Sequence, residues 1–589
     1  MKKTLLGIIL IPIFASSQVN VSTTPSNRVA ILEEYTGNFC TYCPDGHLIA
    51  SDDIEPTGAV TLKIQTGGFS GTDPVFGGSL QTSTGNTIAG PFDSQGYPNG
   101  SVNRTGAYSG IGRAEWVAAV NDIQSQSSPV NLYIESDIDV TTRELTVSVE
   151  YYYTGNPSSA SNFLHIGYYQ DNIPAYQYDP GFNESQFYML NEGIYDFDHC
   201  FRDMINGTWG EELTSLSMGS TGIITHTITL PATFDVFEVE PGAIKIFAFM
   251  SETNQGEIIT ADKISPSYNN WPAVDDAKLF YSNTISEENC IGKPGSFSPT
   301  LLVGATGSNG LSTLDLTAEI NGVQGNQSYS SLNLNQSEKK AISLTTPIQF
   351  NYQASNSLSA SVSNPNSQVD PTADNDYNTT FDGGTTAVAS KILLRVKTDS
   401  YADEESSFNV YDGSGNVVFN VGLGDLPNSA TTDYPLELPY GIDCYQFELL
   451  DTYGDGWGYQ TTSYFRIYEY WNDNLGTLIR TIDSDNELES SLTKAIEFDS
   501  NLDLENDMLI DVDVYPNPAQ NEFHINFGSN NTDNIQIELK NSLGQLVNKI
   551  HLKGKNQADI DISSLESGVY FLNIGFGNKN ITKKLTVTK

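Results

Sequence analysis

Hydrophobic and polar residues alternate with a period of two along most of this chain. The segments "NLYIESDIDV" and "ELTVSVEYYYTG" show the alternation within 130–264, and "KILLRVKTD" and "CYQFELLD" show it within 391–498. Turns rich in Asn, Ser and Gly separate the alternating runs. A strand with one buried face produces this pattern, because successive side chains point to opposite faces of a sheet. The pattern therefore predicts a mainly β chain built from several β-sandwich modules.

The region 28–128 differs, because strand and helix signals alternate there. "RVAILEEYTG", "AVTLKIQTGG" and "NGSVNRT" are strand candidates. "RAEWVAAVNDIQSQ" has helical spacing of its apolar residues, which are Trp116, Val117, Val120 and Ile123. This alternation predicts a small α/β domain before the β modules.

The composition of the chain limits the kinds of molecule that it can bind. The chain has 589 residues, with 28 Lys and Arg against 72 Asp and Glu, and a net charge of −44. Such a chain would be repelled by nucleic-acid phosphates, so neither DNA nor RNA is an expected partner. Hydrophobic residues make up 38% of the chain, which is enough to form packed cores.

The N-terminus resembles a secretory signal. Lys2 and Lys3 precede an apolar run, which ends in the small residues Ala15, Ser16 and Ser17. We expect cleavage before Gln18, and no transmembrane segment in the mature chain. The mature protein would then act outside the cytoplasm, where disulfides persist. Five cysteines is an odd number, so at least one is free or paired between chains.

The stretch "EEYTGNFCTYCPDGH", 33–47, places Cys40 and Cys43 between a strand and an expected helix. Thioredoxin-like folds carry their dithiol at this position, because a helix N-terminus stabilises a thiolate. Cys40 would be the exposed nucleophile with a lowered pKa, and Cys43 the resolving thiol. "GYPNGSVNR" places Pro98 just before a strand, where such folds carry a cis-proline that faces the dithiol.

Three interpretations of this CxxC pair stay open. It can be a structural disulfide that staples the turn, since disulfides outside the cell are usually structural. It can exchange with other thiols and disulfides. It can also hold a metal together with His47, although no second CxxC is present to complete a tetrahedral site. Haem attachment is excluded, because Pro44 stands where that pattern requires His.

The last segment, 512–589, resembles the C-terminal sorting domain of type IX secretion substrates in Bacteroidota. The resemblance rests on "VYPNPAQNEFHINF", "IELKNSLGQLV", "DISSLESGVYFLNI" and the basic end "KKLTVTK". It implies interaction with the type IX secretion machinery, export across the outer membrane, and release or surface attachment. It implies nothing about what the exported part does.

A second resemblance covers roughly 28–265, to the outer membrane protein 28 family of Bacteroidota. It rests on "EEYTGNFCTYCPDGH", "GYPNGSVNR", "YYQDNIPAYQ" and "DHCFRDMINGTWGEEL". The resemblance implies a thioredoxin-like domain followed by a β-sandwich. The resemblance implies a cellular location and a fold, but no biochemical mechanism.

The motif "DTYGDGW", 451–457, follows a strand and is a candidate calcium site. Carboxylates on a glycine-containing turn suit Ca²⁺, which prefers several oxygen ligands from a loop. The candidate ligands are Asp451, Asp455 and, from the earlier segment "TDSYADEESSF", Asp399. Alternatively, the two aspartates of the motif bond turn amides while Trp457 fills the core.

Together these patterns predict a modular exported protein with a binding or surface role. An extracytoplasmic thiol–disulfide oxidoreductase is the alternative, and a carbohydrate-binding or adhesin-like protein is the third class. The third class would bind surface polysaccharide or another surface ligand and show an exposed aromatic patch on a β module. Motifs for a nucleophile elbow, a zinc protease or a nucleotide-binding loop are not found.

The expected domains follow from the composition shifts and the resemblances. They are a signal peptide (1–17), a thioredoxin-like domain (26–128), a β-sandwich (129–268), an Ig-like β-sandwich (269–386), a β-sandwich with the DTYGDGW motif (387–500), an acidic linker (501–511) and the sorting domain (512–589).

Overall fold

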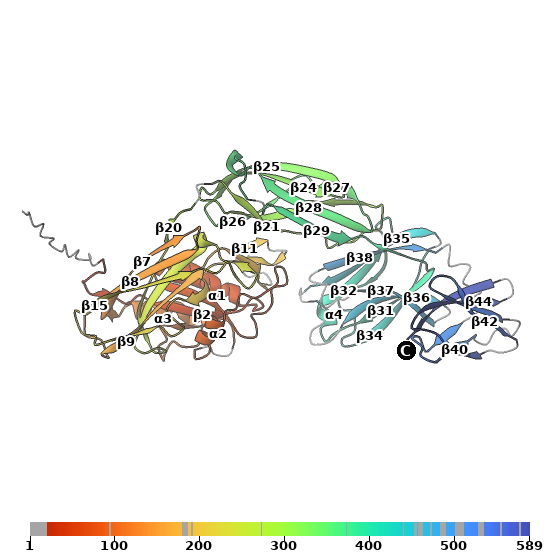
Figure 1. Cartoon of the computed structure of the whole chain (residues 1–589), viewed down its shortest axis with the longest axis horizontal. Coiled ribbons are helices and arrows are strands. Elements are labelled where there is room, and N and C mark those ends of the chain that lie inside the picture. Colours follow the sequence, from red (N-terminus) through yellow and green to blue (C-terminus); the bar gives the residue numbers. More distant parts are fainter. Residues whose placement is uncertain are drawn as a thin grey trace, which may run out of the picture.

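The computed structural model shows a succession of β modules joined end to end (Figure 1). It describes residues 20–589 apart from 93–95, 180–185, 190–191, 272–273, 373, 440, 453–455, 458–462, 472–473, 483–490, 501–511, 528–534, 554–556 and 577–578. The predicted signal peptide and the linker therefore lie outside the described residues. The mainly β, multidomain architecture is confirmed.

A mixed sheet begins in the N-terminal region and continues into the next one. Its strands, in spatial order, are β19 (Ile258–Ile264), β18 (Ile244–Ser251), β9 (Ser161–Gln170), β13 (Cys200–Met204), β3 (Val60–Gln65), β2 (Ile31–Thr36), β4 (Asn99–Val102) and β5 (Ile111–Gly112), with β14 (Glu211–Thr214) beside β9. β2 runs parallel to β3 and antiparallel to β4. β13 joins β3 in parallel through Cys200 and Lys63, so one sheet spans the predicted boundary at residue 128.

Helices flank the N-terminal strands of this sheet. They are α1 (Cys43–Ile49), α2 (Ser83–Ala89) and α3 (Arg113–Gln124), and α1 continues into a π-helical turn (Ala50–Ile54) and a 3-10 turn (Glu55–Thr57). Trp116, Val120 and Ile123 of α3 are buried against Leu32 of β2 and Val102 of β4. The helical spacing predicted for this segment is therefore confirmed.

A second sheet packs on the later part of the first and completes a β-sandwich core. Its strands are β15 (Thr221–Thr229), β8 (Glu144–Tyr153), β7 (Val130–Asp139) and β20 (Ser267–Asn269). A small separate sheet has the order β10 (Ile173–Tyr176), β12 (Ile194–Phe197) and β11 (Phe187–Met189). Short pairs complete the region, β1 (Ser26–Asn27) with β6 (Ser127–Ser128) and β16 (Thr233–Phe234) with β17 (Phe237–Glu238).

The third region forms the span at the top of Figure 1 and encloses its own core. Its sheets are β21 (Ala277–Ser282), β23 (Thr300–Ala305) and β26 (Lys339–Ser343); β22 (Pro294–Phe297) and β27 (Ile348–Asn351); and β25 (Val323–Leu334), β24 (Leu311–Ile320), β28 (Ser355–Ser363) and β29 (Asp376–Asp382). On β24, Leu314, Leu316, Ala318 and Ile320 are buried, which is the period of two expected from the sequence.

The fourth region is a sandwich of two sheets around another core. One sheet contains β30 (Thr385–Ala387), β38 (Ser491–Asp499), β35 (Ile442–Asp451), β32 (Ser406–Tyr411) and β33 (Val417–Val421). The other contains β34 (Thr431–Glu437), β31 (Lys391–Lys397), β36 (Tyr464–Trp471) and β37 (Asn474–Ile482), and the short helix α4 (Ala402–Glu405) precedes β32.

The terminal region is a small sandwich with a separate core. Its sheets are β39 (Asp513–Tyr515), β40 (Glu522–Asn526) and β43 (Gln557–Asp561), and β42 (Leu546–Leu552), β41 (Ile535–Asn541), β44 (Gly568–Phe576) and β45 (Lys579–Val587). Within the described part of the chain, the helices are all too short or too polar to span a bilayer.

Candidate functional site

The CxxC pair lies where the sequence predicts it, between β2 and α1. β2 ends at Thr36, and α1 begins at Cys43 with Pro44 in its first turn. Proline suits this position, because its fixed φ matches the helix and the N–H it lacks would be unpaired there. Cys40 and Cys43 are joined by a disulfide.

The predicted cis bond between Tyr97 and Pro98 is confirmed. Pro98 packs directly against α1 at Gly46, where an added Cβ would lie 2.8 Å from the Pro98 Cγ. A glycine at position 46 therefore permits the close approach of helix and proline. The structure thus brings Pro98 against the helix that starts at Cys43, and whether it acts on a substrate remains a prediction.

The expectation that Cys40 is exposed is wrong for this structure. Cys40 is 3% exposed and Cys43 is fully buried. The segment that follows β10 covers the pair: Gln177 Nε2 donates to the carbonyl of Cys40 at 3.2 Å, and the Tyr178 N–H donates to the carbonyl of Asn38 at 2.8 Å. This cover comes from a segment more than 130 residues away in sequence, so the local strand–CxxC–helix pattern gave no sign of it.

Two consecutive acidic residues of β2, Glu33 and Glu34, lie on opposite faces of the sheet, because side chains alternate along a strand. Glu33 accepts two hydrogen bonds from the buried guanidinium of Arg104, at 2.8 and 2.5 Å. Glu34 is 1% exposed and lies on the α1 side, where its Oε1 is 3.5 Å from His47 Nε2. An Oε1 of Glu34 would also lie 3.0 Å from a Cβ added at Gly46, so this carboxyl reaches the first turn of α1.

Burial determines the protonation of this pair. Desolvation raises the pKa of Glu34 to about 8, although the nearby Lys63 opposes the shift. Desolvation, reinforced by Lys63, lowers the pKa of His47 well below its usual value. At neutral pH, Glu34 is therefore mostly a neutral acid and His47 a neutral imidazole, whose Nε2 is 2.9 Å from Thr36 Oγ1. Such a carboxyl can hold a proton and release it in a pH range useful for thiol chemistry.

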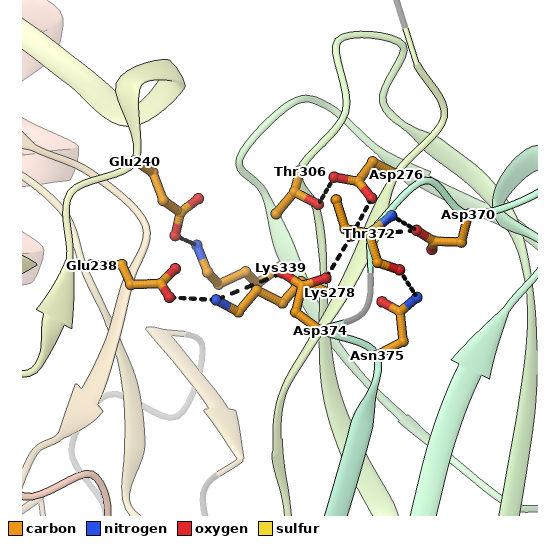
Figure 2. Close-up of polar contacts among 10 residues, drawn as sticks. All are labelled: Glu238, Glu240, Asp276, Lys278, Thr306, Lys339, Asp370, Thr372, Asp374 and Asn375. Carbon is orange, nitrogen blue, oxygen red and sulfur yellow. Dashed lines mark hydrogen bonds and ion pairs between the residues drawn. The ribbon is translucent and has the colours of Figure 1, made fainter. Parts of the chain in front are cut away.

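The third region packs against the small sheet β10–β12–β11, from whose strand β10 the covering segment follows. Met189 of β11 and Ile194 of β12 share a hydrophobic cluster with Leu302 of β23. Figure 2 shows the polar part of this junction. The buried ammonium of Lys339 donates to Glu240 at 2.7 Å and to the carbonyl of Asn172, just before β10, at 2.8 Å. A second ion pair joins Lys278 to Glu238 at 2.5 Å.

The candidate calcium ligands are described only in part. Asp399 and Asp451 are both buried, after β31 and at the end of β35, whereas Asp455 lies outside the described residues. Trp457 is fully buried in the core of this module, and its Nε1 donates to the carbonyl of Leu450 at 3.0 Å. Among residues that are described, no three His, Cys, Asp or Glu side chains are grouped to hold a metal. Calcium binding stays a prediction.

Sequence reasoning left the pairing of the other three cysteines open, and the structure shows a second disulfide, Cys290–Cys444, which links positions 154 residues apart. It joins the third and fourth regions beside Ala495. Next to it, Glu288 accepts from both terminal nitrogens of Arg480 at 2.8 and 2.7 Å. The odd cysteine count was the signal available, and Cys200 is the buried free thiol that accounts for it.

Two family models match parts of the chain. Residues 513–588 match the secretion system C-terminal sorting domain, and residues 86–263 match the outer membrane protein Omp28. Both resemblances drawn from the sequence are confirmed, although the Omp28 match begins after the CxxC pair. The chain is thus a substrate of type IX secretion with a region similar to the outer membrane protein Omp28, and it is located outside the cell or at the outer-membrane surface.

Solved structures from Porphyromonas gingivalis resemble the chain distantly. HBP35 is 14% identical, with 52% of this chain and 98% of HBP35 covered and a TM-score of 0.31. A domain of the outer membrane lipoprotein Omp28 is 12% identical, with 24% of this chain and 91% of that domain covered and a TM-score of 0.17. None of the curated proteins matches this chain.

Proposed function

We propose that this exported protein is a non-catalytic binding protein of the cell surface or its surroundings, in which Cys40–Cys43 is a structural disulfide. The observation that carries the proposal is the burial of an already formed disulfide beneath Gln177 and Tyr178. An exchange centre needs an accessible thiolate, whereas a structural disulfide does not.

The N-terminal unit is, in this proposal, a thioredoxin-like domain that serves as a scaffold. The parallel β2–β3 pair, the antiparallel β4 and the position of α1 after β2 support that assignment. The predicted domain boundaries remain proposals, since the sheet continues through β13 into the second region.

Thiol–disulfide exchange is the second candidate, and the buried Glu34 favours it. In that reaction, the reduced Cys40 thiolate attacks a substrate disulfide and releases one substrate thiolate. Cys43 then loses its proton to the ionised form of Glu34, the minor form at neutral pH, and attacks the mixed disulfide, which releases the second substrate thiolate and re-forms Cys40–Cys43. Two electrons pass to the substrate, and an external thiol must reduce the enzyme again. The cover would have to move before either step.

Reduction of insulin by dithiothreitol separates the two candidates. A structural pair predicts that the full chain adds nothing to the uncatalysed rate. Acceleration that Cys40→Ser abolishes, without a change in melting temperature, would establish the exchange enzyme instead. Cys200→Ala is the matched control, because Cys200 is a buried free thiol outside the pair.

A further inference from the structure

The outer face of the sheet β34–β31–β36–β37 combines aromatic and basic side chains. Ile392, Leu394, Phe465 and Ile467 point into the core of the fourth region. Their neighbours along the strands therefore point outward, since side chains alternate. The outward residues are Lys391, Leu393, Arg395 and Lys397 on β31 and Tyr464, Arg466, Tyr468 and Tyr470 on β36, and among them Leu393 is buried opposite Tyr468.

Cations and tyrosine rings are paired along this face. The guanidinium of Arg466 lies 3.8 Å from the ring centre of Tyr464, and that of Arg395 lies 5.7 Å from Tyr468. The ammonium of Lys391 is 5.3 Å from the ring centre of Tyr470. At these distances the ring quadrupole attracts the cation, which holds each ring and its partner in a defined place.

The face is accessible and has an apolar margin. The side chains of Lys391 and Arg395 are 31% and 29% exposed. Leu475 and Leu478 of β37 lie opposite Tyr470 and Tyr468 and are 42% and 46% exposed. Trp471, at the end of β36, is 43% exposed but lies on the opposite side of the sheet, together with Glu469, against Gly476. The aromatic side chains of the face itself, Tyr464, Tyr468 and Tyr470, are partly exposed.

The charge of the face is opposite to that of the chain. Arg395 is paired with Asp433 through two hydrogen bonds of 2.7 Å, and Lys391 with Glu437 at 3.4 Å. For Arg466 and Lys397, the described residues supply no ion-pair partner. Among its described residues the face therefore has more positive than negative side chains, in a chain of net charge −44. Acidic groups farther away than a Debye length of about 8 Å are largely screened and do not cancel this excess.

We propose that this face binds a polysaccharide that carries carboxylate groups. The flat tyrosine rings can stack on the apolar C–H faces of sugar rings, and the fork of Arg466 matches a carboxylate. Tyr464 and Tyr468 are four residues apart on one strand, about 13 Å, which suits a polymer rather than a single sugar. Single-stranded nucleic acid also combines stacking rings with negative charge, so it serves as a comparison ligand in the test. The inference rests on the proposed binding role and specifies its ligand.

Affinity measurements on the full chain test the proposal, with polygalacturonate as the probe and dextran and oligo(dT) as comparison ligands. The chain should bind polygalacturonate more tightly than either comparison ligand. Arg466→Gln and Tyr468→Leu should each weaken binding by about tenfold, as expected when a central contact is removed. Tyr133→Leu and Lys340→Gln are the matched controls, on strands β7 and β26 of other regions.

Melting temperature separates binding from a purely structural role of the face. The two test variants should melt within about 2 °C of the wild type, since surface substitutions usually cost little stability. A wild type that fails to bind polygalacturonate, or variants that bind it unchanged, would refute the proposal. Equal binding of oligo(dT) would refute the polysaccharide assignment. The insulin assay does not involve this face, so failure here would leave the structural role of Cys40–Cys43 standing.

Discussion

The two disulfides of this protein are both buried, yet they stabilise different parts of it. Cys40–Cys43 closes a loop of three positions within the N-terminal unit, next to the helix that carries His47. Cys290–Cys444 closes a separation of 154 positions and ties the third region to the fourth. Sequence spacing made the first pair conspicuous and left the second unnoticed. The conspicuous pair is thus not the one expected to contribute most to stability.

The difference follows from chain entropy. A cross-link removes conformations from the unfolded chain, and it removes more of them when the closed loop is long. The local pair has little effect of this kind, so its contribution depends mainly on its surroundings. Those surroundings include the buried acid Glu34, whereas the long-range pair lies beside Ala495 and the ion pair of Glu288 with Arg480.

The largest expected effect comes from removing the long-range pair. Cys290→Ala together with Cys444→Ala should lower the stability of the third and fourth regions by up to about 5 kcal/mol. Urea unfolding monitored by tryptophan fluorescence measures the loss, since Trp457 is buried in the fourth region. If this loss of stability is no larger than the loss on removing Cys40–Cys43, the long-range disulfide is not the more stabilising of the two.

Glu34→Gln should change the pH dependence of stability by an amount on the order of 3 kcal/mol. The pKa of Glu34 is raised in the folded protein to about 8, so the wild type binds this proton more tightly when folded. The resulting stabilisation is complete below the unfolded pKa, near 4.5, and is lost as the pH rises to about 8. Wild-type stability should therefore fall between pH 6.5 and 8.5 relative to the variant.

Chemical denaturation at pH 6.5, 7.5 and 8.5 measures this difference. His47 does not contribute to it, because the pKa of His47 is lowered in the folded state and its effect on stability is confined to pH values near and below 6.5. Glu144→Gln, on an exposed position of β8, is the matched control and should parallel the wild type. If the stability of Glu34→Gln changes with pH in the same way as that of the wild type, Glu34 is already ionised at neutral pH.

Removing the short disulfide should cost less than removing the long one. Cys40→Ala with Cys43→Ala is expected to lower the stability of the N-terminal unit by about 2 kcal/mol, the low end for disulfides. Hydrogen exchange of the peptides around the fully buried Trp116 measures the loss in this unit separately from the other regions. No loss at all would mean that the pair is not a staple, and would favour the exchange enzyme.

The smallest effect is expected at the DTYGDGW motif. If calcium binds there, Asp451→Asn should lower the melting temperature by a few degrees when Ca²⁺ is present and much less when it is absent. Asp382→Asn, at the exposed end of β29, is the control. An equal loss with and without Ca²⁺ would favour aspartates that only bond turn amides.

Local patterns predicted much of this fold because they depend on neighbouring residues. The alternation in β24 and β31 and the helical spacing around Trp116 appear as expected. The cis bond before Pro98 was also predictable, since a cis peptide bond is rare except before proline.

Long-range packing was not predictable in the same way. The burial of Cys40 depends on Gln177, and the partner of Cys290 lies 154 residues away, so neither leaves a local signature. The continuation of the sheet through Cys200 and Lys63 is equally non-local. A single sequence records which residues prefer to be buried, but not which segment covers them.

The reduction potential of Cys40–Cys43 in the full chain tests the central claim most directly. Equilibration with dithiol buffers, followed by alkylation and mass spectrometry, reports each disulfide separately. A structural pair sealed beneath Gln177 and Tyr178 predicts a potential below about −300 mV. A potential near −200 mV, in the range of disulfide-exchange proteins, would contradict the account and make the pair a redox centre.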